Sequence, residues 1–344
     1  MSQYRYLALA LQTRCDAINR LPDDEVRKAM LASVARIGVQ IRSAKAFLGP
    51  DLKLVVLPEY FMTSYPLGDT IDGWASKAAI APGGPEYDAL GKLAADNGIY
   101  LSGNVYETDE HFPGLYFQTS FITAPTGDVI LRYRRLISMY TATPHDVWDK
   151  YLDIYGIDGV FPVADTELGR LACCASEEIL FPEVCRAHAL RGAEIILHSS
   201  SEVASPDLTP KDVAKRARAI ENLVYVVSAN TGGLYDAGIP PASTDRMSKI
   251  VDYKGNVLCN AASGETVAAN ASIDLAALRH WRQRPGMPNY FGRQRLEVFA
   301  ESYRGSVYPP NTLLKDGQHV VPERSHFIER QRETLARLHN ENLI

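Results

Sequence analysis

The chain has 344 residues, of which 46% are apolar and 22% are charged, as in a globular protein with a full hydrophobic core. A net charge of -5, without any run of Lys and Arg, argues against a nucleic-acid-binding surface or a polybasic membrane patch. No apolar stretch approaches the roughly 20 residues needed to cross a bilayer. The first residues lack the apolar segment of a signal peptide, so we expect a cytoplasmic protein.

The cysteine content indicates neither a disulfide framework nor a metal site. The five cysteines are an odd number, and Cys173 and Cys174 are adjacent within an apolar run. No Cys or His pair has the spacing of zinc ligands. We therefore expect the chain to hold no metal and no cofactor.

Short apolar runs alternate with stretches of helical periodicity, which predicts an α/β fold. Apolar residues recur at helical spacing between residues 26 and 44, and Gly49 and Pro50 end that helix. The segments 117–123 and 129–134 flank a turn with a glycine, which predicts a β-hairpin. Further strands are expected over 4–11, 54–57, 100–106, 171–175, 195–197, 224–229, 247–251 and 257–259, and further helices over 87–97, 182–192 and 213–222.

The composition changes beyond Asp274, where Arg, Tyr and Pro become frequent. This last segment could not form a core alone. We therefore expect one domain over residues 1–279 and a C-terminal extension over 280–344 that packs on the domain or on a neighbouring subunit. The extension contains the sequence Tyr-Pro-Pro-Asn at 308–311.

Polar residues follow three of the predicted buried strands directly. Glu59 ends one apolar run, and a carboxylate there is costly to desolvate unless it has a partner or a role. Ser176 follows a second run and would lie in a sharp strand-to-helix turn, a recurring position for a nucleophile. The polar run 198–202 follows a third. The same pattern also fits ordinary strand–helix crossovers with surface carboxylates.

The segment around Ser176 resembles the nucleophile region of the nitrilase superfamily of carbon–nitrogen hydrolases. The family pattern is a Gly, an apolar strand, the catalytic Cys, one residue, Asp or Glu, then Phe-Pro-Glu, an Arg, and Arg-Gly-Ala-Glu. Gly169, the Phe-Pro-Glu at 181–183 and the Arg-Gly-Ala-Glu at 191–194 match it, and counting from either side places the catalytic Cys at Ser176. Further matching segments in family order extend the resemblance over most of the chain.

The resemblance implies the superfamily's four-layer αββα sandwich and self-association into dimers or larger oligomers. It implies hydrolysis of a carbon–nitrogen bond in a small amide-like molecule, without a cofactor. The Tyr-Pro-Pro-Asn sequence is similar to that of amidase-type members, which implies that the C-terminal extension reaches across a subunit interface.

The resemblance also assigns three catalytic positions. Family members use Glu as general base, Lys as oxyanion stabiliser and proton donor, and Cys as nucleophile. These positions correspond to Glu59, to Arg135 after Tyr133 and Arg134, and to Ser176. Two of the three therefore differ from the family pattern.

A second group of residues is expected around these three. Glu178 matches the acid that follows the family nucleophile, the backbone N–H of Glu177 would be an oxyanion donor, and Asp146 is the nearest candidate for a second acid downstream of the Lys position. Candidates for the substrate pocket are Tyr60, Tyr65, His198 and Ser201.

The two replacements weaken acyl-transfer chemistry. A thiol, with a pKa of about 8.5, is readily ionised and strongly nucleophilic, whereas a serine hydroxyl needs a stronger base. The spacing supplies no such base beside Ser176. Arg135 keeps the positive charge but is a poor proton shuttle, and an ion pair with it would make Glu59 a weaker base.

Four interpretations stay open. The chain is a hydrolase that uses Glu59, Arg135 and Ser176, or it catalyses a changed reaction without a covalent intermediate. Alternatively it is a non-catalytic protein whose Arg135 binds an anionic ligand, or an engineered Cys-to-Ser variant of an amidase, which leaves Arg135 unexplained. Cys173 and Cys174 lie within the apolar strand, so we expect core thiols there rather than substitute nucleophiles.

Overall fold

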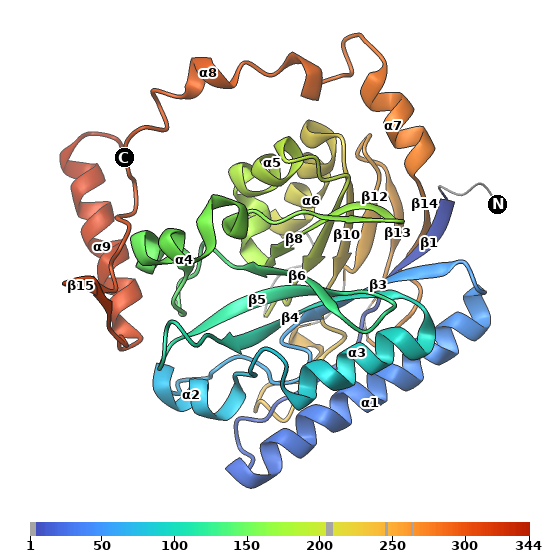
Figure 1. The fold of residues 1–344 in the computed structure, drawn as a ribbon, viewed down its shortest axis with the longest axis horizontal. Helices are drawn as coiled ribbons and strands as arrows, with labels where there is room; N and C mark the ends of the chain where they lie inside the picture. The colour runs from blue at the N-terminus through green and yellow to red at the C-terminus, as the bar shows by residue number, and fades with distance from the viewer. Residues whose placement is uncertain (1–4, 204–208, 245–246, 263) are drawn as a thin grey trace.

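The computed structural model describes residues 5–203, 209–244, 247–262 and 264–344. Two six-stranded sheets lie face to face, and helices cover the outer face of each, as Figure 1 shows. This is the expected four-layer αββα sandwich. Among the helices of the described ranges, none is both long enough and apolar enough to cross a membrane.

The first sheet has the strand order β14-β1-β3-β4-β5-β6. Strands β1, β3 and β4 run parallel to one another, and antiparallel strands complete both sides. The strands are β1 (Arg5–Ala10), β3 (Leu52–Glu59), β4 (Tyr100–Thr108), β5 (Tyr116–Thr123), β6 (Val129–Arg134) and β14 (Asn270–Asp274). Helices α1 (Asp23–Leu48) and α3 (Pro85–Asn97) cover its outer face, beside the short α2 (Ile71–Ala78).

The second sheet has the strand order β13-β12-β10-β9-β8-β7. Here β8, β9 and β10 form the parallel centre. The strands are β7 (Ala164–Thr166), β8 (Gly169–Ala175), β9 (Ile195–Ser199), β10 (Tyr225–Ala229), β12 (Lys249–Val251) and β13 (Val257–Asn260). Helices α5 (Pro182–Leu190) and α6 (Pro210–Asn222) cover its outer face. The short β2 (Cys15–Asp16) and β11 (Leu234–Tyr235) pair outside the two sheets.

The apolar run of β3 shows why these strands are buried on both faces. Leu54 and Val56 belong to the core between the two sheets, whereas Val55 and Leu57 belong to the core beneath α1 and α3. Successive side chains of a strand point to opposite faces, so a strand between a sheet and a helix layer needs apolar residues at every position.

The predicted strands and helices are confirmed, with shifts at their ends. Tyr4, the first residue of the strand predicted over 4–11, lies outside the described residues. The hairpin turn between β5 and β6 contains Gly127 at φ 95°, a conformation that favours glycine. The helix predicted over 213–222 begins at Pro210 instead, because the Thr209 side chain caps it and Pro210 occupies its first position.

The C-terminal extension leaves the sandwich after α7 (Leu275–Gln283), so the predicted boundary at residue 279 falls inside a helix. The chain then arcs around the molecule through α8 (Leu296–Phe299) and returns to α4 (Trp148–Val160), as Figure 1 shows. There the Asn311 N–H donates to the carbonyl of His145 at 2.9 Å, so the Tyr-Pro-Pro-Asn sequence packs on its own chain. The last elements are β15 (Leu314–Lys315), β16 (Gln318–His319) and α9 (Ser325–Asn340). Contact with a second subunit stays a prediction.

Candidate active site

The ends of β3 and β9 meet between the two sheets. The Ser199 hydroxyl donates to the carbonyl of Leu57 at 2.8 Å, and the Glu59 N–H donates to the carbonyl of Ser200 at 3.3 Å. Strand β8 pairs in parallel with β9 and ends beside it at Ala175. The polar residues that follow all three strands are therefore brought to one place.

Ser176 directly follows β8 and is the first residue of the 3₁₀ helix Ser176–Leu180, so it lies in a strained strand-to-helix turn, as the sequence predicts. Its φ of 49° is in the left-handed region, which costs a non-glycine residue on the order of 1 kcal/mol. The His198 ring holds the turn, with Nε2 2.8 Å from the carbonyl oxygen of Ser176. Burial lowers the pKa of His198 well below its usual range, so the ring is neutral and Nε2 carries the proton. His198 thus lies behind the nucleophile position and does not line the pocket.

Arg135 follows β6 and is almost completely buried, at 6% exposure. Its Nη1 lies 3.4 Å from Glu59 Oε1 and donates to Gln118 Oε1 at 2.6 Å, and its Nη2 forms an ion pair with Glu177. Its Nε donates to the Ile137 carbonyl at 2.6 Å. Burial disfavours the charged guanidinium, but Glu177 and Glu59 outweigh that effect and raise the pKa of Arg135. These contacts occupy most of its five N–H donors.

Glu59 is held at both oxygens and is 1% exposed. Its Oε1 accepts a hydrogen bond from the Gln118 amide and faces Arg135, and its Oε2 accepts from the Ser201 N–H at 3.1 Å. Gln118 also donates to Asn104 Oδ1 at 3.0 Å, which fixes its amide. The carboxylate therefore has the partners that its burial requires.

Glu178 ties the Arg135 segment to the Ser176 turn. Its carboxylate accepts from the N–H groups of Leu136 (2.6 Å), Ile137 (3.2 Å) and Ala175 (3.2 Å) and from the Tyr133 hydroxyl (2.9 Å). Burial raises its pKa to about 7, although Arg135 and the N–H donors act in the opposite direction. Glu178 is therefore a positioning residue, which sets Arg135 and Ser176 relative to each other.

A pocket of about 640 Å³, a size typical of sites for small molecules, opens beside these residues, and its lining includes neither Glu59 nor Glu178. Arg135, Glu177 and Ser176 line it, and Tyr60 stacks on Tyr106 in its wall with ring centroids 5.4 Å apart. Other residues in the lining are Tyr65, Leu67, Gln118, Tyr140, Ser201, Glu202, Lys211 and Arg324. The structure thus brings together Tyr60, Tyr65 and Ser201, which the sequence proposes for the pocket.

Two residues of this site, Lys211 and Gln118, are not predicted from the sequence. Lys211 lies at the second position of α6, with its Nζ 3.3 Å from Ser176 Oγ and 3.3 Å from Ser200 Oγ. Its signal is the helix start: Thr209 and Pro210 form an N-cap followed by a proline at the first helical position. Gln118 is marked only by being an amide within the buried strand β5, which also contains two threonines and a serine.

Asp146 does not join this group. Its Oδ2 accepts from the Thr143 N–H at 2.9 Å and from the Thr143 hydroxyl at 2.7 Å, and its Oδ1 accepts from the Thr312 hydroxyl at 2.6 Å. The carboxylate therefore caps a 3₁₀ turn and anchors the C-terminal extension. It is not part of the pocket lining.

The three cysteines nearest to Ser176 in the sequence are core thiols, as expected. Cys173, Cys174 and Cys185 are buried, and burial raises the pKa of Cys173 to about 12. A thiol that is neutral and enclosed in a strand cannot replace the nucleophile. Within the described ranges, no three His, Cys, Asp or Glu residues gather as a group that could hold a metal ion.

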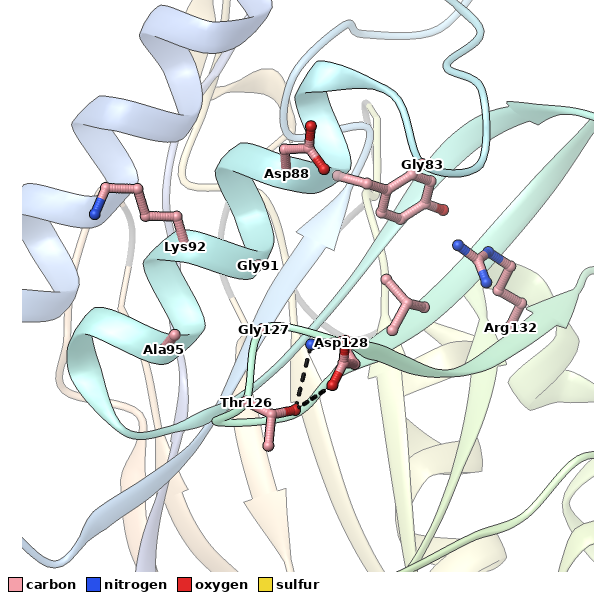
Figure 2. A pocket seen from close by; sticks show the side chains of 11 residues that line it. Gly83, Asp88, Gly91, Lys92, Ala95, Thr126, Gly127, Asp128 and Arg132 are labelled. Atoms are coloured by element: carbon pink, nitrogen blue, oxygen red, sulfur yellow. Dashed lines mark hydrogen bonds between the residues drawn. The ribbon is translucent and has the colours of Figure 1, made fainter.

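A second pocket lies between α3 and the β5–β6 turn, as Figure 2 shows. Asp88 and Lys92 line it from the helix, and Asp128 and Arg132 line it from the hairpin. The Thr126 hydroxyl donates to Asp128 at 2.8 Å within the turn. None of the residues that the sequence proposes for catalysis lies there, so the pocket at Ser176 is the candidate active site.

Comparison with known sequences points to one family. A family model described as carbon-nitrogen hydrolase matches residues 26–283. A formamidase from Bacillus thuringiensis is 29% identical over 223 residues, which cover 63% of this chain and 60% of that protein. A Schizosaccharomyces pombe protein named probable nitrilase is 27% identical over 184 residues, which cover 54% of this chain and 63% of that protein. The matched part thus spans about three fifths of the length of these curated relatives.

Comparison with solved structures concerns the fold. Saccharomyces cerevisiae Nit3, described as a member of branch 10 of the nitrilase superfamily, aligns with a TM-score of 0.64 at 22% identity, over 81% of this chain and 94% of that one. A carbon-nitrogen hydrolase from Helicobacter pylori G27 has the same TM-score at 18% identity, over 88% and 99%. Both share the αββα arrangement with this chain.

Proposed function

The chain belongs to the carbon–nitrogen hydrolase family of the nitrilase superfamily, and from that premise we propose that it hydrolyses the carbon–nitrogen bond of a small, non-peptide amide through an acyl-Ser176 intermediate. The observation that carries this proposal is the position of Ser176. Its strained turn opens into the pocket beside Arg135, and Glu59 lies in contact with that arginine.

The proposed reaction has two halves. The Ser176 Oγ attacks the amide carbon, the carbon–nitrogen bond breaks, and ammonia or an amine leaves with a proton. Water then attacks the acyl group, and the acid leaves as Oγ regains its proton. The guanidinium of Arg135 and the backbone N–H of Glu177 stabilise the oxyanion that develops in each half, and Glu59 is the general base.

The contacts of Arg135 favour this function over a role as an anion receptor. An arginine that grips a ligand carboxylate must present a free fork of N–H donors. Here Glu59, Gln118, Glu177 and the Ile137 carbonyl take most of those donors. Arg135 therefore contributes positive charge to the pocket wall more readily than it binds a second carboxylate.

The test is the release of ammonia from a panel of small amides and nitriles by the native chain and by Ser176→Ala. We expect release that falls at least 10³-fold in the variant, because the nucleophile is lost. Ser138→Ala is the matched control, since Ser138 lines the same pocket and should be dispensable. Equal release by the native chain and Ser176→Ala would contradict the proposal. A Ser176→Cys variant that is active where the native chain is not would identify a disabled enzyme.

A further inference from the structure

We propose that Lys211 is the proton-transfer residue of the site, exchanging a proton with Ser176 in place of the lysine that the family carries at the position of Arg135. This inference rests on the proposed function and adds a catalytic residue to it. The observation behind it is the contact of Lys211 Nζ with Ser176 Oγ at 3.3 Å.

The surroundings of Lys211 differ from those of its neighbouring lysines. Lys215 lies 3.7 Å from Glu202, and Lys249 forms an ion pair with Asp212. Among the residues that the structure describes, Lys211 forms no ion pair, and its Nζ instead donates to two hydroxyl oxygens, those of Ser176 and Ser200. An amine in contact with a hydroxyl can exchange a proton with it along that contact.

The other candidates for this task are occupied. Glu59 is bonded to Gln118 and Ser201 and faces Arg135, and no contact joins it to Ser176 within the described ranges. His198 uses one ring nitrogen on the Ser176 carbonyl and the other on Ser228 Oγ, at 2.8 Å each. Arg135 cannot give up a proton near neutral pH. Lys211 is therefore the titratable side chain in contact with the attacking atom.

The proton moves in a balanced cycle. As the Oγ–carbon bond forms and the carbon–nitrogen bond breaks, Lys211 Nζ gives a proton to the leaving nitrogen and takes the Oγ proton in its place. In the second half Glu59 takes a proton from the attacking water, Lys211 Nζ gives one to Oγ as the Oγ–carbon bond breaks, and solvent returns the Glu59 proton to Nζ. A serine hydroxyl needs such a partner more than a thiol does, because it ionises less readily.

The first test compares Lys211→Met in two backgrounds. In the native chain we expect kcat/KM for amide hydrolysis to fall about 10²–10³-fold. In Ser176→Cys, where the thiol ionises without help, we expect the same substitution to cost less than about 10-fold. Lys211→Arg keeps the charge but exchanges no proton, so it should not restore activity. Equal losses in both backgrounds, or rescue by Lys211→Arg, would overturn the proposal.

The second test does not depend on amide turnover. Diisopropyl fluorophosphate phosphorylates an activated serine, and intact-mass spectrometry follows the adduct. We expect labelling at Ser176 in the native chain, at least 100-fold slower labelling in Lys211→Met, and an unchanged rate in the surface control Lys92→Met. Labelling that is equally fast in the native chain and Lys211→Met would refute the role of Lys211. Labelling that depends on Lys211 without release of ammonia from any amide would refute the proposed function alone. No labelling of the native chain would refute the role of Lys211 as the group that activates Ser176.

Discussion

Two cationic side chains of the pocket lining, Arg135 and Lys211, differ in the groups that they contact. On one side Arg135 is enclosed by Glu59, Gln118 and Glu177 and has few free donors. On the other side Lys211 contacts only hydroxyls among the described residues, one of which is the proposed nucleophile. A guanidinium whose N–H donors are mostly occupied supplies a fixed electrostatic field, whereas an amine beside a hydroxyl can exchange a proton with it.

The difference teaches how one family position can be altered while the chemistry is kept. The family lysine both stabilises the oxyanion and donates a proton. In the proposed mechanism the two tasks fall to two side chains on different elements: Arg135 follows β6, and Lys211 is the second residue of α6. Substitutions at Arg135 and its partners should therefore change the electrostatic field of the pocket and the stability of the fold. Substitutions around Lys211 should change proton transfer.

The largest effect is expected when Arg135 loses its ion-pair partner Glu59. Glu59→Gln keeps the shape but removes the charge that pairs with the buried Arg135. We expect kcat/KM to fall about 10²–10³-fold, because the general base is lost, and the free energy of unfolding to fall by about 3 kcal/mol. Amide hydrolysis assays and urea denaturation measure the two effects.

The control for this substitution is Glu86→Gln. Glu86 is also buried beside an arginine, with Arg27 Nη1 at 3.5 Å, but Arg27 does not line the pocket, whereas Arg135 does. It should lower stability and leave kcat/KM within about 3-fold of the native value. Loss of activity with Glu86→Gln as large as with Glu59→Gln would show that the effect at Glu59 is structural.

An intermediate effect is expected from Arg135→Lys. A lysine keeps the positive charge but cannot reach Gln118, Glu177 and the Ile137 carbonyl together. We expect the free energy of unfolding to fall by about 1–3 kcal/mol and kcat/KM to fall less than about 10-fold. Arg135→Met, which removes the charge as well, should cost at least 10 times more activity than Arg135→Lys. Equal activity of the two variants would remove Arg135 from oxyanion stabilisation.

A smaller effect is expected from removing the N-cap of the helix that carries Lys211. The Thr209 hydroxyl accepts from the Asp212 N–H at 3.3 Å and caps the helix that begins with Pro210 and Lys211. Thr209→Ala should lower the free energy of unfolding by about 1 kcal/mol and lower kcat by a few fold through displacement of Lys211. Thr209→Ser, which can still cap, should restore both values. A kcat unchanged in Thr209→Ala would show that the cap does not position Lys211.

The smallest effect on activity is expected from His188→Leu, a substitution behind Tyr133 and Glu178, which hold the segment after Arg135. The His188 ring packs on Tyr133, with centroids 5.1 Å apart, and Tyr133 donates to Glu178. Burial lowers the pKa of His188 to about 3. The unfolded chain therefore takes up a proton near pH 6.5 that the folded chain takes up only near pH 3, so the native fold loses stability as pH falls through this range.

His188→Leu should lack this part of the pH dependence and keep its activity at neutral pH. Urea denaturation between pH 4.5 and 7 measures it, with the native chain expected to lose more stability toward low pH than the variant. Parallel curves for the two proteins would show that His188 is not held neutral by the fold.

Local patterns in the sequence predict the buried strands and the nucleophile turn, whereas the four-layer sandwich is predicted from the family resemblance. Every position of the run in β3 is apolar, as a strand buried on both faces requires, and Ser176 interrupts such a run directly before a helix. The carboxylate at Glu59 was predictable for the same reason. Its pairing with Arg135 followed from matching the family order.

The rest of the site depends on contacts that no local pattern shows. Lys211 reaches Ser176 from 35 residues away, and only a helix that starts at Pro210 instead of residue 213 includes it. Asp146 is the nearest candidate along the chain for the second acid of the family, at a longer spacing. Its carboxylate is used by Thr312, a residue of the extension whose path is not encoded near Asp146. Side chains bonded across distant segments are therefore the ones missed.

The measurement that tests the central claim most directly is the mass of the enzyme quenched in acid during turnover of a small amide. We expect an acyl adduct on the peptide that contains Ser176, absent in Ser176→Ala. Ammonia release by the native chain without an adduct, in a quench series that spans the first turnover, or an adduct on Cys173 or Cys174 instead, would contradict it.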